Sequence, residues 1–298
     1  MPALGRGVSG PAMSNAIRIA HGKFGRVALL DMDASLVRHA HPHCHVLIKA
    51  GGADTRFLVR DRLVPLTGSN AVLIDAWEPH AYVHGAGQPR SVILAFYIEP
   101  RWLSCFRPNW SASAAPGFFA RHSDWITPRI RRRADELAAL MVAAPAAGRT
   151  QEALISALMI DVIERYAPWR TASLGQLGCR GRVDYRIRRA LALIEGDAAG
   201  AYDMKRLARE VGLSRAHFFR LFGKAVNVSP RVFLNTLRME SAVAEVIEGN
   251  VRMADVSDRL GFSAPAHFTR FFRDHAGAPP REFRTIARLG APRQEAAG

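Results

Sequence analysis

Cysteine is scarce in this chain of 298 residues, which contains only three. Cys44, Cys105 and Cys179 form neither the even-numbered set of a disulfide framework nor the closely spaced pairs of a zinc finger. The first twenty residues lack the apolar core of a secretory signal, and no stretch approaches the roughly 18 apolar residues of a membrane span. We therefore expect a cytoplasmic protein that does not enter the membrane.

Motifs of catalysis are also missing. The sequence contains no recognisable nucleophile–base pair and no glycine-rich loop of the kind that cradles phosphates, so we expect a protein that is not an enzyme and needs no cofactor. Lysine is rare as well, and the net charge of +15 comes mainly from arginine and lies mostly after residue 100. Such an excess suits a polyanionic partner, although a general preference for arginine would produce it too.

A pattern that is written twice near the end of the chain is the most specific feature. Residues 206–233 read RLAREVGLSRAHFFRLFGKAVNVSPRVF, and residues 255–283 read DVSDRLGFSAPAHFTRFFRDHAGAPPREF. Each copy predicts an apolar-periodic helix, a glycine turn, a serine that caps the next helix (Ser214 or Ser263) and a second short helix. This is the pattern of a helix-turn-helix unit, and two such units suggest a grip on two successive stretches of DNA groove.

The segment between the units supports this interpretation. Residues 229–249 predict a helix of roughly 19 residues, which would be about 28 Å long. Successive major-groove faces lie about 34 Å apart, so one connecting helix has nearly the right length to span them. Arg220 and Arg270 occupy equivalent positions and could contact guanine or phosphate; the alternative is two solvated arginines with internal ion pairs. The predicted DNA-facing residues are Ser214, Arg215, Ala216, Phe219, Arg220, Lys224, Ser263, Ala266, His267, Thr269, Arg270 and Arg273.

Residues 183–288 resemble the DNA-binding domain of the AraC/XylS family of bacterial transcription regulators. The matching residues are Leu207-Ala208, Gly212-Leu213-Ser214, Arg220, Phe222, Ser229-Pro230, Leu237-Arg238, Gly261-Phe262-Ser263, His267-Phe268, Arg270, Phe272, Gly277, Pro280 and Phe283-Arg284. The resemblance implies recognition through Ala216, Phe219 and Arg220 in the first unit, and through Ala266, Thr269 and Arg270 in the second. It also implies promoter DNA and RNA polymerase as partners. Asn227 replaces the usual glycine after the first recognition helix, and asparagine tolerates the left-handed conformation required there.

The rest of the chain predicts an α+β protein. Short strand-like segments broken by glycine and proline favour an antiparallel barrel or sandwich before residue 100, and two amphipathic helices begin at Pro128 and after Thr150. The expected layout is a flexible arm (1–20), a cupin-like effector-sensing domain (21–100), a helical dimerisation segment and linker (101–182), an all-α domain with two helix-turn-helix units (183–288) and a disordered tail (289–298).

Histidine clusters in the predicted sensory domain. The segment HAHPHCHV puts a histidine at every second position from His39 to His45, and His80 and His84 follow later. This resembles the cupin-like sensory domain of the same regulator family, where an HxH strand and a later histidine point into the barrel. Lys49 stands where metal-binding cupins have a carboxylate, and Cys44 should point away from His43 and His45.

Three interpretations of these histidines stay open. They could hold zinc, iron or nickel, bind an organic effector without metal, or line a vestigial pocket. An organic effector with a carboxylate could be bound by the positive charges of His43, His45 and Lys49. The predicted effector-binding residues are His43, His45, Lys49, His80 and His84, and the candidate metal ligands are His43, His45 and His80.

The resemblance also implies a homodimer whose interface lies on the helices of residues 124–167. The two faces expected there consist of Ile130, Leu137, Leu140 and Met141, and of Leu154, Leu158 and Val162; simple packing against the barrel is the alternative. We predict a sequence-specific transcription regulator, an activator, controlled by a small-molecule effector. The alternatives are a metal-dependent cupin enzyme with a DNA-binding appendage and a nonspecific architectural DNA protein.

Overall fold

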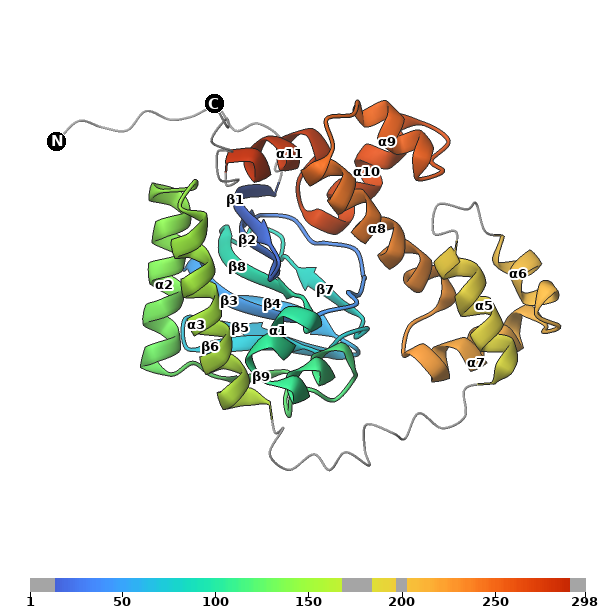
Figure 1. The fold of residues 1–298 in the computed structure, drawn as a ribbon, viewed down its shortest axis with the longest axis horizontal. Helices are drawn as coiled ribbons and strands as arrows, with labels where there is room; N and C mark the ends of the chain where they lie inside the picture. Colours follow the sequence, from blue (N-terminus) through green and yellow to red (C-terminus); the bar gives the residue numbers. More distant parts are fainter. Residues whose placement is uncertain (1–13, 168–183, 197–202, 290–298) are drawn as a thin grey trace.

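The computed structural model describes residues 14–167, 184–196 and 203–289. The predicted arm up to residue 13, the linker at 168–182 with Cys179, and the tail after Leu289 lie outside the described residues. The chain folds first into a β-rich part covered by helices and then into an all-helical part that lies beside it (Figure 1). This is the predicted α+β architecture.

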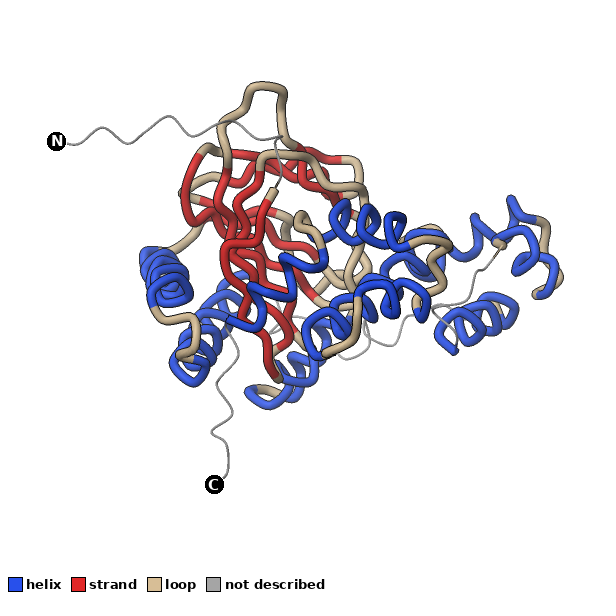
Figure 2. The backbone as a smooth tube through the Cα atoms, turned by 90° about the horizontal axis from the view of Figure 1, so that it is seen from above, coloured by secondary structure: helices blue, strands red, loops and turns tan. Residues whose placement is uncertain are grey.

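The β-rich part consists of two antiparallel sheets that pack against each other. Figure 2 shows the strands as one block with helices around it. Six strands form one sheet in the order β1-β2-β8-β3-β6-β9, and three form the other in the order β5-β4-β7. The strands are β1 (Asn15–Gly22), β2 (Gly25–Met32), β3 (Cys44–Gly52), β4 (Thr55–Val59), β5 (Arg62–Leu66), β6 (Asn70–Ile74), β7 (His80–Val83), β8 (Ser91–Ile98) and β9 (Ser123–Trp125).

Alternation along β3 explains how one strand serves two cores. Cys44, Val46 and Ile48 belong to the core between the six-stranded sheet and the covering helices. Leu47 belongs to the core between the two sheets, and His45 points to that same side because successive side chains of a strand face opposite ways. The prediction that Cys44 points away from His45 is thereby confirmed.

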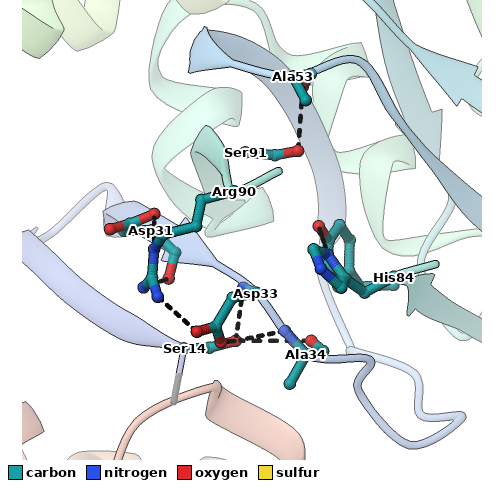
Figure 3. Close-up of polar contacts among 9 residues, drawn as sticks. Ser14, Asp31, Asp33, Ala34, Ala53, His84, Arg90 and Ser91 are labelled. Atoms are coloured by element: carbon teal, nitrogen blue, oxygen red, sulfur yellow. Dashed lines mark hydrogen bonds and ion pairs between the residues drawn. The ribbon is translucent and has the colours of Figure 1, made fainter. Parts of the chain in front are cut away.

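The start of β1 corrects the predicted arm, which extended to residue 20. Residues 15–20 belong to β1, and Ser14 is already buried in front of it. The Ser14 hydroxyl accepts hydrogen bonds from the backbone N–H groups of Asp33 and Ala34, both at 3.2 Å (Figure 3). Arg90, directly before β8, bonds Asp31 at 2.8 Å and also pairs with Asp33 (Figure 3). These contacts connect the start of β1 to β2 and to the start of β8. They join residues far apart in the chain, so the local sequence of residues 1–20 does not predict them.

Helices cover the outer face of the six-stranded sheet. They are α1 (Pro100–Phe106), the 3-10 helix η1 (Pro108–Ala114), α2 (Pro128–Ala143) and α3 (Gly148–Tyr166). Thr127 caps α2 as predicted, because its side chain accepts the Ile130 N–H at 3.2 Å. The predicted start of α3 at Thr150 is wrong: the helix begins at Gly148, with Ala147 in the cap position and no side-chain hydrogen bond.

The predicted dimer faces of α2 and α3 are largely used inside the protomer. The buried side chains are Ile130, Leu137, Met141, Leu158 and Val162, all of which belong to the core against the sheet. Leu154 is partly buried and packs on the same core. These side chains cannot also contact a second copy of the chain. The structure therefore supports the alternative, packing against the barrel, for these faces.

The helical part contains two units that share one long helix. The helices are α5 (Tyr185–Gly196), α6 (Met204–Glu210), α7 (Arg215–Val226), α8 (Pro230–Glu248), α9 (Met253–Arg259), α10 (Pro265–Ala276) and α11 (Pro280–Leu289). Ser229 caps α8 through the Val232 N–H at 3.2 Å. Among the helices of the described ranges, none is long and apolar enough to cross a membrane.

The helical part is docked on the β-rich part. Thr236 of α8 donates a hydrogen bond to the Ala40 carbonyl at 3.1 Å, and the ring of Phe233 stacks on Trp77 with centroids 4.6 Å apart. Side chains of α8, α10 and α11 join the core between the two sheets, while Ala40 and Trp77 join the core of the first unit. The β-rich and helical parts therefore share apolar cores, which the sequence did not predict.

Candidate DNA-binding interface and histidine cluster

The first recognition helix, α7, is positioned by a turn and a cap that the sequence predicts. Gly212 adopts φ +72°, a left-handed conformation that side chains other than glycine rarely accept. The Ser214 side chain accepts the His217 N–H at 3.3 Å and starts the helix. Phe218 and Phe222 are fully buried and hold the helix on its core. The exposed side chains on the remaining face are Arg215, Ala216, Arg220 and Lys224.

The second recognition helix, α10, begins differently from the first. Its cap position is Ala264, which makes no side-chain hydrogen bond, so the predicted capping role of Ser263 is wrong. Ser263 instead bonds its hydroxyl to the Nδ1 atom of His267 at 2.9 Å. The second copy has one more residue than the first between its turn glycine and its second helix: α7 begins three residues after Gly212, and α10 begins four residues after Gly261. This extra residue moves Ser263 out of the cap position. The exposed side chains on this helix include Ala266, His267, Thr269 and Arg270.

The cations on the two recognition helices are available to a partner. Within the described ranges, Arg220, Lys224 and Arg270 have no acidic partner, and this removes the alternative of internal ion pairs for the two equivalent arginines. Arg273 is half-buried and lies 3.4 Å from the carboxylate of its neighbour Asp274. Unpaired guanidinium groups on an exposed helix face suit contacts to phosphate or to guanine.

Two predicted base-reading residues are constrained by their own helix. Phe219 is half-buried and packs on the core of its unit, with the Arg215 guanidinium 5.5 Å from its ring centroid. Thr269 donates its hydroxyl proton to the Pro265 carbonyl at 2.9 Å, which leaves its methyl group and an acceptor lone pair for a partner. Arg220 and Arg270 are thus long side chains on the two helices whose N–H groups have no acidic partner within the described residues.

A single helix joins the two units. The 19 residues of α8 make a rod of about 28 Å, as the sequence predicts, against the roughly 34 Å between successive major-groove faces. Asn227, which ends α7, has φ +64°, and Gly277 ends α10 with φ +77°. Both recognition helices therefore stop in the same left-handed conformation before the chain turns into the next helix.

The second candidate site is a cluster of four buried histidines in the β-rich part. His39, His41, His45 and His80 are 6%, 4%, 3% and 1% exposed. Neighbouring imidazole rings in the cluster have centroids 4.5–5.3 Å apart. His39 reaches the cluster through an antiparallel bridge with His80, where each N–H bonds the carbonyl of the other residue.

Burial keeps these imidazoles neutral. Loss of solvation lowers the pKa of each of the four, and the proximity of the other histidines lowers it further. The pKa of His45 and that of His80 fall to about 3. Neutral imidazole is the form that binds a metal ion.

The predicted effector-binding residues do not share one pocket. His45 and His80 lie in the cluster. Lys49 lies four residues after His45 in β3, and its ammonium is 2.6 Å from the Asp54 carboxylate. His84 lies at the edge of the barrel beside the turn that contains Ala34 (Figure 3), and its Nδ1 atom is 3.1 Å from the Tyr82 hydroxyl.

His43 also lies apart from the cluster, in a cleft between the barrel and α8. Its Nε2 atom is 3.5 Å from Glu99 and 3.6 Å from Glu240. The cleft has a volume of about 260 Å³, and Arg26 and Tyr97 contribute to its lining. The sequence pattern missed His39 and His41 as members of the buried site. They precede the strand, as His43 does, so the alternation along β3 places only His45.

Comparison with known proteins agrees with the helix-turn-helix architecture of the helical part. Residues 207–286 match a family of helix-turn-helix domains. The chain is 30% identical over 107 residues to the HTH-type transcriptional regulator GbdR of Pseudomonas aeruginosa, which is 36% of this chain and 29% of that protein. The C-terminal part of this chain is an AraC-type helix-turn-helix domain. The resemblance that the sequence predicts is thereby confirmed for this part.

Two further relatives extend the comparison. The lactose operon transcription activator of Staphylococcus xylosus is 26% identical over 102 residues, which is 34% of this chain and 37% of that protein. The chain thus spans about a third of the length of the curated relatives that it matches. The solved structure of a ToxT variant from Vibrio cholerae resembles 91% of this chain and all of that chain, with a TM-score of 0.54 and 12% identity. At this identity the likeness concerns the fold alone: a β-rich N-terminal part followed by a helical part.

Proposed function

We propose that this protein is a sequence-specific, DNA-binding transcription regulator, an activator, that a small-molecule effector controls. One observation carries the proposal: two similarly built units expose unpaired cations, Arg220 with Lys224 and Arg270, on their second helices, and one 19-residue helix joins them. The names of the relatives, transcription regulators and activators, support the same function. DNA as the partner also supports the expected cytoplasmic location.

The two units contribute unequally in this proposal. Arg270, Thr269 and His267 form a polar exposed face on α10, whereas α7 offers Arg220 beside the methyl group of Ala216. We expect the second unit to read bases at least as strongly as the first. The first unit then depends on Arg220 and on contact between Ala216 and a thymine methyl group.

A gel-shift titration against the promoter region that adjoins the gene tests this proposal. Arg270→Ala should weaken specific binding by about 1–3 kcal/mol and relax the preference at one base position. Arg56→Ala is a matched control, because it removes the same charge from an exposed position of β4, outside both recognition helices. Equal affinity of wild type and Arg270→Ala for the specific site would refute the role of α10.

The salt dependence separates this function from that of a nonspecific architectural protein. A specific regulator keeps a ratio of about 10³ or more between promoter and scrambled DNA, while the affinity for both falls as salt rises. Loss of that ratio at every salt concentration would favour the architectural alternative.

The effector site belongs, in our proposal, to the cleft between the barrel and α8. It offers Arg26 and His43 on the barrel and Glu240 on α8, so an occupant would contact both parts of the chain at once. An effector that binds better in one arrangement of these parts shifts the population of DNA-binding forms. Mass spectrometry of the protein under native conditions would reveal a co-purified molecule, and its loss in Arg26→Ala would support the cleft.

Homodimer formation and contact with RNA polymerase complete the proposal, on the family resemblance alone. Analytical ultracentrifugation of the full chain tests the dimer. Any interface must use side chains other than the buried apolar faces of α2 and α3.

A further inference from the structure

The four-histidine cluster contains nitrogen atoms that hydrogen bonding inside the protein leaves unused. The Nδ1 atoms of three rings lie 2.7–2.8 Å from backbone carbonyl oxygens: His39 from Val37, His45 from Phe96 and His80 from Glu78. A carbonyl only accepts, so each Nδ1 carries the proton and donates it. The Nε2 atom of each ring then carries a lone pair. A backbone carbonyl behind Nδ1 is also the usual support of a histidine that binds a metal ion through Nε2.

His41 has the same arrangement with a different acceptor. Its Nδ1 atom lies 3.4 Å from a carboxylate oxygen of Glu240 on α8. The Nε2 atoms of His41 and His80 are fully buried and have no hydrogen-bond partner within the described part of the chain. Buried polar atoms without a partner are rare in folded proteins and call for an explanation.

Ring nitrogens of three of these histidines lie close together. One ring nitrogen of each of His39, His41 and His80 lies within 4.8 Å of the other two. Two nitrogen ligands on a tetrahedral zinc ion, at bonds of about 2.0–2.1 Å, are roughly 3.4 Å apart, so small rotations of the rings would bring all three into contact with one ion.

The space beside the cluster suits an ion and excludes an organic effector. The hollow between the sheets that His39, His45 and His80 help to line has a volume of about 20 Å³. Pockets for organic ligands usually measure about 300–1,000 Å³, while one water molecule needs only about 10–15 Å³. A ligand set of neutral imidazoles favours zinc, nickel, cobalt, copper or iron over magnesium and calcium, which prefer oxygen.

Within the described part of the chain, charged side chains near the cluster include Arg26 and Glu240. The Arg26 guanidinium lies 4.1 Å from the Tyr97 ring centroid, and the His45 ring stacks on the same Tyr97 ring at 4.3 Å. The Glu240 carboxylate lies behind His41 and supplies negative charge near the site.

We propose that His39, His41 and His80 bind one divalent transition-metal ion through their Nε2 atoms. This ligand set differs from His43, His45 and His80, the set that the sequence pattern suggests, in two of its three members. His43 contacts Glu99 and Glu240 outside the cluster, so the two sets make different predictions for its removal.

Isothermal titration of the full-length, tag-free protein with zinc tests the site, after removal of metal with a chelator. Wild type should bind one equivalent, and titration with cobalt should give the visible absorption of a tetrahedral nitrogen-bound ion. His41→Gln and His80→Gln should lose zinc affinity by roughly 100-fold or more, and His39→Gln likewise. His43→Ala and His21→Ala should still bind one equivalent.

The outcomes that overturn the proposal are specific. They are the absence of tight zinc, cobalt or nickel binding by wild type, or retention of one equivalent by the three glutamine variants when circular dichroism shows that they are folded. Loss of the metal in His43→Ala but not in His39→Gln would support the other ligand set. The glutamine variants keep polar side chains of similar length, which limits damage to the fold.

The position of the site connects it with the helical part, a step that rests on the proposed DNA-binding function. A metal ion on Nε2 of His41 makes its Nδ1–H a stronger donor toward Glu240, and the His275 ring of α10 lies 6.1 Å from that of His39. Zinc should therefore alter the affinity for promoter DNA in wild type, and the change should be smaller in Glu240→Gln at zinc concentrations that saturate the site of that variant. Zinc binding without any effect on DNA affinity would refute the coupling alone. Failure to bind promoter DNA in any state would refute the proposed function and leave the metal titration valid.

Discussion

Cys44 shows at the scale of one residue how strand alternation determines reactivity. Its side chain lies in the core between the six-stranded sheet and the helices, and burial, with the nearby charge of Asp75, raises the pKa of its thiol to about 12. Only the thiolate reacts quickly with alkylating reagents. We expect iodoacetamide at neutral pH to modify the exposed Cys105 and to leave Cys44 unmodified until denaturant is added. Peptide mapping by mass spectrometry measures both sites, and equal labelling of the two in folded protein would contradict the orientation of β3.

The histidines show how far residue-level prediction reaches. Alternation correctly separates Cys44 from His45 because both lie in one strand. The same rule fails for His39 and His41, which lie in an irregular segment before the strand. His39 enters the cluster through its bridge with His80, 41 positions later in the chain, and no local pattern contains that contact. Lys49 keeps the alternation but pairs with Asp54 instead of lining the buried site.

The two recognition helices provide a test at the scale of the element. Ser214 caps α7 through the His217 N–H, whereas Ser263 precedes the cap position of α10 and bonds a histidine side chain. Ser214→Ala should therefore lower the free energy of unfolding by about 1 kcal/mol, and Ser263→Ala should change it by less than about 0.5 kcal/mol. Urea unfolding followed by circular dichroism measures both. Equal losses would show that the two helices begin in the same way after all.

Prediction from sequence succeeds for elements whose signals are local. Helical periodicity with Thr127-Pro128 and Ser229-Pro230 locates α2 and α8, since caps and apolar stripes lie within the element. Strands depend on partners elsewhere in the chain. The strand-like segments that the sequence predicts, Val27–Leu30, His45–Ile48, Arg56–Val59, Ala71–Ile74 and Ser91–Ile98, lie in β2, β3, β4, β6 and β8. The sequence does not predict β1, β5, β7 and β9; β7 has four residues and β9 has three, too few for a clear alternation. The start of α3 was also missed, because no side chain caps it.

At the scale of the whole molecule, the sequence predicts two parts but not their shared cores. Trp77 and Phe233 stack across the boundary although 156 positions separate them. The Ala40 carbonyl next to the histidine cluster accepts the hydrogen bond of Thr236 on α8. In the sequence, Trp77 and Ala40 fit loop positions and Phe233 and Thr236 fit positions of a helix, so none of them predicts a contact between the two parts. Only the folded structure shows that they meet. In our proposal, a ligand at the cluster or in the cleft acts through these contacts on α8, the helix that joins the two helix-turn-helix units.

The Trp77–Phe233 contact gives this docking a direct test. Trp77 lies in a loop of the β-rich part with φ +59°, and its indole packs on the core of the first helix-turn-helix unit. Trp77→Ala removes this aromatic contact and should destabilise the docked arrangement by about 1–3 kcal/mol. Two separate transitions should then appear in calorimetry, because the helical part no longer unfolds together with the sheets. Trp125→Ala is the matched control, since that side chain is 70% exposed. If Trp77→Ala and Trp125→Ala melt with the same profile as wild type, the two parts are not coupled through this contact.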